Sequence, residues 1–198
     1  MNRQALVLAS TSPRRVGLLK QLGIEFDVVD PGDAENSTSR DPITRVRDHA
    51  LCKAEAIAKK YPDRLVVAAD TIVVLDGKIL EKPRSREEAK EMLRILGGRT
   101  HKVVSAIALL EKRRNLMDIR TEETMVSIKR LSEEEIEAYV ATGEPMDKAG
   151  AYAAQGVGAV IIEKVDGCFY NVVGLPLSLL HIMLKNVGVN TLRIYRET

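Results

Sequence analysis

Two short, unbroken apolar runs constrain the fold of this chain most. Residues 5–9 read ALVLA and residues 65–69 read LVVAA. Such a run is typical of a β-strand that is covered on both faces, as in a parallel sheet. Between the runs, the sequence predicts a helix after Pro13, a second strand at 26–29 and a long amphipathic helix at 43–60. The first third of the chain is therefore predicted to fold as a β-α-β-α-β unit.

The rest of the chain predicts an antiparallel portion. Asp76-Gly77 and Asp166-Gly167 are each flanked by apolar runs, and each predicts a β-hairpin, the second one joining 160–165 to 169–173. Further elements are predicted from apolar periodicity and capping residues: strands at 101–110 and 119–128, helices at 85–97, 132–143 and 176–185, and an edge strand at Leu192–Tyr195. We therefore expect an α/β fold with a mixed sheet. Because no repeat or linker interrupts the chain, residues 1–198 are predicted to form a single domain with two lobes.

Composition excludes several classes of protein. The 30 Lys and Arg residues nearly balance the 28 Asp and Glu residues, so any site for an anion must be built locally. Nucleic-acid binding is disfavoured by this near-neutral charge and by the absence of tryptophan. Two cysteines and three histidines do not indicate a disulfide framework or a histidine-rich metal centre. No apolar run is long enough for a signal peptide or a membrane span, so we expect a cytoplasmic protein.

The segment that follows the first apolar run is a candidate anion site. Ser10 and Ser12 precede a predicted helix whose first turn carries Arg14 and Arg15. A helix N-terminus attracts anions through its free N–H groups, whereas two cations there are unfavourable unless an anion neutralises them. A polyphosphate is therefore one interpretation of this segment. The alternative is a serine cap followed by surface arginines.

Two acidic and two basic residues are further candidates. Asp70 directly follows the second apolar run, and the carboxyl ends of strands are where open α/β sheets bind ligands. Its carboxylate is suited to hold Mg²⁺ or to deprotonate water, although an aspartate at this place also ends a strand or caps a turn. Glu35 is a second possible metal-facing acid, in a loop. Lys53 and Lys82 are suited to phosphate, the alternative being solvated surface lysines.

The segment DKAGAYAAQG, residues 147–156, is the last candidate. Its small residues and glycines permit a close approach of backbone to a ligand, and the Gln155 amide is suited to hydrogen bonds with a base. The alternative is a tight glycine loop without a ligand. His49 and His101 are interpreted as structural or surface residues. The chain has no GxxxxGK[ST] motif, so a P-loop nucleotide site is excluded.

Six motifs in a fixed order give the chain a family resemblance. LASTSPRR, AADT, EKPRSREEA, GGRTHKVVS, DKAGAYAAQG and NVVGLPL follow one another between Leu8 and Leu180. Together they resemble the Maf family of nucleoside triphosphate pyrophosphatases. The resemblance implies an elongated mixed sheet flanked by helices, with two lobes and a central cleft, as in inosine triphosphate pyrophosphatases. It also implies hydrolysis of a nucleoside triphosphate to the monophosphate and pyrophosphate with a divalent metal, usually Mg²⁺, and pairing of two chains as a homodimer.

The resemblance assigns expected roles to residues of this chain. Asp70 matches the catalytic acid and, with Glu35, the metal-facing carboxylates. The expected substrate-binding residues are Ser10, Ser12, Arg14, Arg15, Lys53, Thr71, Lys82 and Gln155, of which Arg14, Thr71 and Gln155 match positions associated with base specificity. The absence of tryptophan after Pro13 resembles the branch that acts on dTTP and UTP, and modified pyrimidine nucleotides are further expected substrates. The alternatives are a 7-methyl-GTP pyrophosphatase and a nucleotide-binding regulator of cell division that acts without turnover.

Overall fold

The computed structural model describes residues 6–35 and 37–192, and its chain divides into two compact units. The first unit comprises residues 1–70, 105–122 and 174–198, and the second comprises residues 71–104 and 123–173. Each unit is therefore assembled from separate stretches of the chain. That all 198 residues form a single domain stays a prediction.

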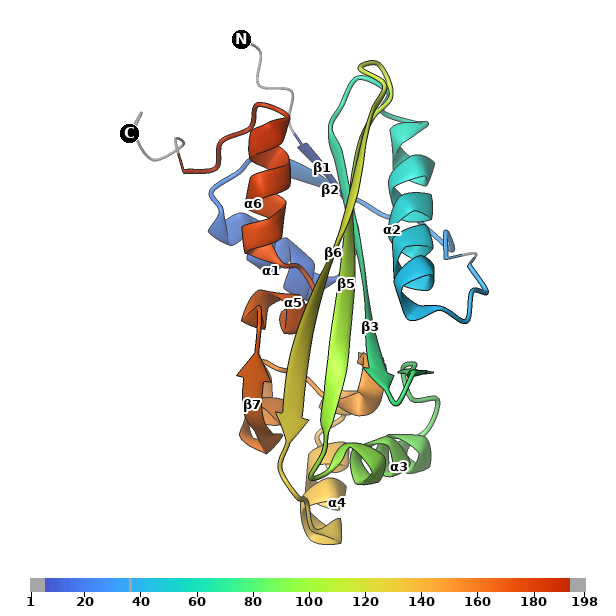
Figure 1. Cartoon of the computed structure of the whole chain (residues 1–198), viewed down its shortest axis with the longest axis vertical. Coiled ribbons are helices and arrows are strands. Elements are labelled where there is room, and N and C mark those ends of the chain that lie inside the picture. Colours follow the sequence, from blue (N-terminus) through green and yellow to red (C-terminus); the bar gives the residue numbers. More distant parts are fainter. Residues whose placement is uncertain (1–5, 36, 193–198) are drawn as a thin grey trace. The chain divides into compact units, whose positions relative to one another are not determined.

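The first unit contains the parallel strands that the apolar runs predict. Strand β1 (Leu6–Ala9) is buried along its whole length and pairs in parallel with β2 (Phe26–Val29) on one side and with the start of β3 (Val66–Leu75) on the other. Three helices belong to this unit: α1 (Pro13–Gln21), α2 (Pro42–Ala58) and α6 (Leu177–Asn186). In Figure 1, α2 lies on one side of these strands, and α1 and α6 lie on the other. The buried character of β1 follows from this cover on both faces.

Strand β3 is longer than predicted, and this corrects the expected position of Asp70. The sequence predicts a strand that ends at Asp70, but β3 continues through it to Leu75. Its neighbour β1 ends at Ala9, and Leu8 pairs with Val67. Asp70 therefore lies within β3 but beyond the carboxyl end of β1. This is the kind of sheet edge at which α/β proteins bind ligands.

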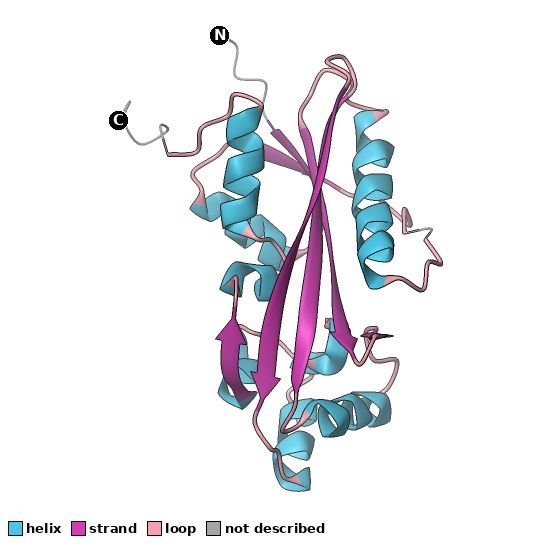
Figure 2. Cartoon of the chain, viewed as in Figure 1, coloured by secondary structure: helices cyan, strands magenta, loops and turns pink. Residues whose placement is uncertain are grey.

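The described strands form one mixed sheet, which confirms the predicted α/β class. The strand order is β2-β1-β3-β5-β6-β7, and β4 pairs with β3. Figure 2 shows the long strands β5 (Thr100–Glu111) and β6 (Leu116–Ile128), which have residues in both units, as β3 does. The first predicted hairpin is confirmed, since β3 and β4 (Lys78–Leu80) pair antiparallel around Asp76-Gly77.

The second unit packs helices around its own apolar core. Its regular elements are α3 (Arg86–Leu96), α4 (Glu133–Ala141), the 3₁₀ helices η1 (Glu144–Asp147), η2 (Ala149–Ala151) and η3 (Gly156–Ile161), strand β7 (Ile162–Asp166) and α5 (Phe169–Val173). Two helices start at the predicted serines. Ser85 accepts a hydrogen bond from the Glu88 amide, and Ser132 forms a reciprocal capping box with Glu135. Leu93, Leu96 and Ile128 are buried in the core of this unit.

The second predicted hairpin is wrong. β7 pairs antiparallel with β6, and residues 169–173 form helix α5 instead of a returning strand. The fully buried Asn171 explains the difference, because its side-chain amide donates to the Val103 carbonyl at 3.1 Å and to the Thr124 hydroxyl at 2.9 Å. These contacts fix the segment by tertiary hydrogen bonds that a local apolar pattern does not reveal.

The edge strand predicted near the end of the chain can be checked at only one residue. Leu192 lies in a turn, and the rest of the edge strand expected at Leu192–Tyr195 falls outside the described residues. In the part of the chain that the structure describes, every helix is too short or too polar to cross a lipid bilayer.

Two glycines predict opposite responses to alanine. Gly77 has a φ of +76° in the β3–β4 turn, whereas Gly17 lies inside α1 with open space where a Cβ would stand. We expect Gly77→Ala to lower the free energy of unfolding by about 1–2 kcal/mol, because a side chain disfavours a left-handed backbone. Gly17→Ala should raise it by roughly 0.5–1 kcal/mol, because alanine loses less entropy in a helix. Urea unfolding of the two variants measures both effects; a gain of stability in Gly77→Ala would contradict the turn conformation, and a loss in Gly17→Ala would contradict the open space at that position.

A candidate active site around Asp70

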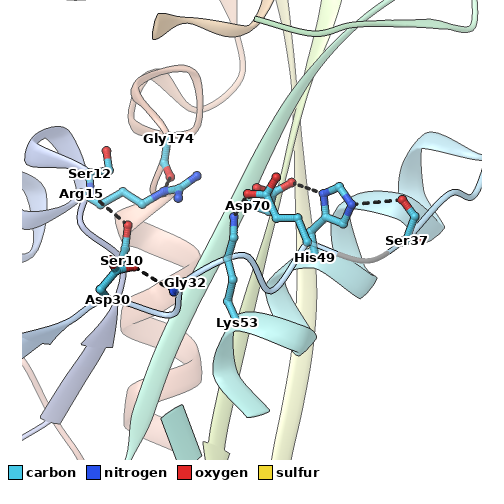
Figure 3. Close-up of polar contacts among 11 residues, drawn as sticks. Ser10, Ser12, Arg15, Asp30, Gly32, Ser37, His49, Lys53, Asp70 and Gly174 are labelled. Atoms are coloured by element: carbon cyan, nitrogen blue, oxygen red, sulfur yellow. Dashed lines mark hydrogen bonds and ion pairs between the residues drawn. The ribbon is translucent and has the colours of Figure 1, made fainter. Parts of the chain in front are cut away.

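Asp70 is a buried carboxylate with two cationic or titratable partners. Its side chain is only 10% exposed. The Lys53 ammonium donates to Oδ1 at 2.7 Å, and Nδ1 of His49 lies 3.3 Å from Oδ2. Figure 3 shows both side chains reaching Asp70 from α2. Each oxygen of the carboxylate therefore has a partner, as a buried charge requires.

Helix α2 places the two partners by simple periodicity. Its first turn is held by Asp41, whose side chain accepts from the Thr44 amide at 2.8 Å, and by Pro42 at the first position. His49 and Lys53 are four residues apart, so they lie on the same face of the helix. The interpretation of His49 as a structural or surface residue overlooked its contact with Asp70. The spacing from Lys53 was the signal that would have found it.

The charges of this group are strongly coupled. Burial alone would raise the pKa of Asp70, but the hydrogen bond from His49 and the charges of Lys53 and Arg15 lower it to about 2. Asp70 is therefore ionised at neutral pH. The contact with Asp70 raises the pKa of His49, against burial, which lowers it. Because Nε2 of His49 faces the Ser37 carbonyl at 3.3 Å, the imidazolium form satisfies an acceptor at each nitrogen.

Glu35 joins the group through Lys53. After β2, the loop turns at Gly32, whose amide donates to the Asp30 side chain at 2.8 Å. Glu35 Oε1 then lies 2.6 Å from Lys53 Nζ, so that one ammonium touches both the buried Asp70 carboxylate and this exposed one. The structure thus brings together three of the predicted site residues.

The two carboxylates that contact Lys53 are of the kind that binds a hard divalent cation. Among the described residues, no three His, Cys, Asp or Glu side chains gather closely enough to hold a metal by themselves. Zinc takes three or four protein ligands, so these residues do not make a zinc site. Mg²⁺ takes one or two carboxylates and completes its shell with water and substrate phosphate oxygens. Asp70 and Glu35 supply that number of carboxylates.

The start of α1 supplies hydrogen-bond donors and positive charge in the same unit. The Ser12 amide donates to the Ser10 hydroxyl at 3.2 Å, and Ser12 precedes the helix without a side-chain cap. Arg14 and Arg15 lie in the first turn, where the helix dipole disfavours cations. Nε of Arg15 donates to the Gly174 carbonyl at 2.9 Å, which orients the guanidinium (Figure 3).

Arg15 is electrostatically linked to Asp70. Burial lowers the pKa of Arg15, the charge of Asp70 raises it, Arg14 lowers it and Glu35 raises it. An anion at this helix terminus would meet the positive end of the helix dipole and two guanidinium groups at once, which suits a phosphate.

The remaining predicted residues belong to the second unit. Thr71 follows Asp70 in β3 and is half-buried, Lys82 is exposed after β4, and Gln155 is exposed just before η3. Their assignment as substrate-binding residues stays a prediction.

Two contacts within the second unit hold the segment before Gln155: one joins His101 to Tyr152, and the other joins Gly150 to Val73. Nε2 of the buried His101 lies 2.7 Å from the Tyr152 hydroxyl, and the two rings meet edge to face. Gly150, with a φ of +70°, packs its backbone against Val73. Gly150 is therefore required for packing within the unit, and whether the segment also binds a ligand stays a prediction.

Comparison with known proteins decides the family. A model of the family described as Maf-like protein matches residues 5–187. The chain belongs to the Maf family. Among the curated relatives of this Maf-family chain, a dTTP/UTP pyrophosphatase from Dictyoglomus thermophilum is 43% identical over 96% of the chain and 100% of the relative. A dTTP/UTP pyrophosphatase from Pelotomaculum thermopropionicum is 49% identical over 94% of the chain and 98% of the relative.

A solved structure supports the fold of the Maf-family chain. The Staphylococcus aureus Ham1 protein matches with a TM-score of 0.56 at 16% identity, covering 92% of this chain and 98% of that protein. At this identity the likeness concerns the fold alone. It agrees with the mixed α/β architecture predicted from the sequence.

The buried His101 predicts an acid-sensitive stability. Burial lowers the pKa of His101 to about 4 in the folded protein. In the unfolded chain, the same imidazole is protonated near pH 6.5. Stability is therefore lost as pH falls from 6.5 toward 4, by roughly 2–3 kcal/mol at pH 4.5. Urea unfolding at pH 7.5 and pH 4.5 should show a smaller loss in His101→Gln than in the parent protein. Equal losses in both proteins would show that His101 is not the group responsible.

Proposed function

We propose that this Maf-family chain hydrolyses dTTP and UTP to the nucleoside monophosphate and pyrophosphate. The observation that carries the proposal is the contact of one ammonium, that of Lys53, with the buried Asp70 and the exposed Glu35 carboxylates. Carboxylates beside a cluster of cations are the groups that metal-assisted phosphoanhydride hydrolysis needs. The choice of substrates follows the relatives at 43% and 49% identity, which are named dTTP/UTP pyrophosphatases.

The triphosphate is proposed to bind at the start of α1. Arg14 and Arg15 carry charges that pair with phosphate oxygens, and the helix dipole adds to the positive potential there. Ser10 and Ser12 contribute hydroxyl groups, with Lys53 and Lys82 as further cations. The bond from Arg15 to the Gly174 carbonyl restricts the guanidinium before substrate arrives, which reduces the entropy lost on binding.

Asp70 and Glu35 are the proposed ligands of a divalent cation, Mg²⁺ being the one that fits two carboxylates and phosphate oxygens. When bound, such a cation neutralises the charge that develops on the phosphate oxygens. Lys53 lies between the two carboxylates, so a cation held by Asp70 and Glu35 would take the place of its ammonium, which would then pair with phosphate. The lysine therefore keeps the carboxylates compensated before substrate and metal arrive.

The reaction is an attack of water on the α-phosphorus. A bond forms between the water oxygen and phosphorus, the bond to the bridging oxygen of the β-phosphate breaks, and pyrophosphate leaves. The ionised Asp70 accepts a hydrogen bond or a proton from the attacking water, and His49 holds its Oδ2 in place. Positive groups at the start of α1 stabilise the leaving pyrophosphate.

Base selection is proposed for the second unit. Thr71 and Gln155 offer hydroxyl and amide groups that both donate and accept, which suits the edge of a pyrimidine. Turnover is favoured over a regulator that only binds nucleotide, because Asp70 repels a polyphosphate and weakens simple binding. A 7-methyl-GTP pyrophosphatase has no support among the names of the two relatives described above.

Release of pyrophosphate from dTTP, UTP, CTP, GTP and 7-methyl-GTP, with and without Mg²⁺, tests the proposed function. We expect metal-dependent release that is selective for dTTP and UTP. Preference for 7-methyl-GTP would keep the chemistry and overturn the assignment of Thr71 and Gln155. Tight nucleotide binding without release from any of the five would favour the regulator.

Replacement of Asp70 tests the centre of the mechanism. Asp70→Asn preserves the shape of the side chain and removes its charge, so we expect turnover to fall by about 10²–10⁴. A Mg²⁺ titration separates the two roles of the carboxylate. A loss that persists at saturating Mg²⁺ assigns Asp70 to the attacking water, and a loss that added metal largely reverses assigns it to the cation. Turnover near that of the parent protein at all Mg²⁺ concentrations would remove Asp70 from the chemistry.

A further inference from the structure

Backbone amides on both sides of Gln155 donate hydrogen bonds to two side chains, Tyr139 on α4 and Glu144 in η1. Residues 152–155 have no strand or helix of their own, so their amide groups need other partners. On the N-terminal side of Gln155, the Ala153 amide donates to the Tyr139 hydroxyl at 3.1 Å. On the C-terminal side, the Val157 and Gly158 amides donate to the Glu144 carboxylate at 3.1 and 2.7 Å.

Tyr139 and Glu144 act as one unit. The Tyr139 hydroxyl donates to Oε2 of Glu144 at 2.8 Å while it accepts from Ala153. The carboxylate thus accepts three hydrogen bonds, two from backbone amides and one from the phenol. Bonds to an ionised acceptor are stronger than neutral ones, so this pair holds both flanks of Gln155 firmly.

The fit between the pair and the segment is close. Gly156 has a φ of +76°, and a Cβ there would collide with Oε1 of Glu144. A Cβ at Gly158 would collide with the Tyr139 hydroxyl. The glycine in AAQG therefore makes room for a side chain of the protein itself, where the sequence suggested close approach to a ligand.

Gln155 is the exposed member of this fixed segment. Ala153 and Ala154 before it and Gly158 after it are buried, whereas Gln155 is exposed. A side chain that reads a base by hydrogen bonds must be held in position by groups that do not themselves touch the base. Tyr139 and Glu144 are placed to do this, and the Tyr139 ring is only 4% exposed.

We propose that Tyr139 and Glu144 are positioning residues for base selection, which fix the backbone on both sides of Gln155 and thereby set the preference among pyrimidine nucleotides. This inference rests on the proposed function, since it takes Gln155 as the residue that reads the base. It assigns to the pair no contact with substrate and no part in the hydrolysis itself.

Glu144→Gln is the sharpest test, because it keeps the shape of the side chain and turns one acceptor into a donor that faces a donor. We expect the ratio of kcat/KM for dTTP to that for CTP to fall about tenfold, as for the loss of one hydrogen bond to a charged group. The fall should arise in KM, with kcat for dTTP within about threefold of the parent value. Tyr139→Phe should act in the same direction. Glu137→Gln, which makes the same change at an exposed position on α4 paired with Lys90, is the control and should leave the ratio unchanged.

Amide hydrogen exchange, followed by NMR, tests the positioning without reference to activity. The Ala153, Val157 and Gly158 amides should exchange faster in Glu144→Gln and Tyr139→Phe than in the parent protein and in Glu137→Gln. Slow exchange that persists in both variants would overturn the inference, and so would an unchanged dTTP/CTP ratio in both.

Gln155→Ala separates failure of this inference from failure of the proposed function. If Gln155→Ala lowers the ratio and the Glu144 and Tyr139 variants do not, the base-reading role stands and the positioning role is wrong. If Gln155→Ala leaves the ratio unchanged, the proposed role of Gln155 itself fails and takes the inference with it. In support of the inference, Glu144→Gln should add little to the effect of Gln155→Ala in the double variant.

Discussion

The contact of Asp70 with Lys53 and His49 is the interaction on which the arrangement of the first unit depends. Burial disfavours an ionised carboxylate, but the hydrogen bond from His49 and the charges of Lys53 and Arg15 outweigh burial and lower the pKa of Asp70. Helix α2 must therefore lie where its lysine and histidine reach β3. Removal of either partner on α2 would leave part of this buried charge without compensation.

The same group explains why the loop after β2 matters. Glu35 is exposed and reaches Lys53 from a segment without regular structure, whereas Asp70 is fixed in the middle of a strand. One carboxylate is thus rigid and the other belongs to a loop, where binding groups often lie because loops adapt to ligands. For the proposed cation site, this asymmetry would let one ligand adjust while the other stays fixed.

Local signals in the sequence predicted the parts of the fold that depend on neighbouring residues. The buried runs of β1 and β3, the Asp76-Gly77 hairpin and the serine caps of α3 and α4 all follow from short-range pattern. The continuation of β3 past Asp70 and the helix at 169–173 depend instead on strand register and on the buried amide of Asn171. The contact of His49 with Asp70 joins residues 21 positions apart, so amino-acid composition did not predict it.

The division of the chain into two units has a consequence for how such a protein can change over time. The first unit is drawn from three stretches of sequence and the second from two, and β3, β5 and β6 each contribute to both. No contiguous stretch of a gene encodes either unit alone, so neither can be exchanged between proteins by simple recombination. Asp70 and Thr71 are adjacent in one strand yet fall in different units. Substitution of single residues is therefore the change that leaves both units whole.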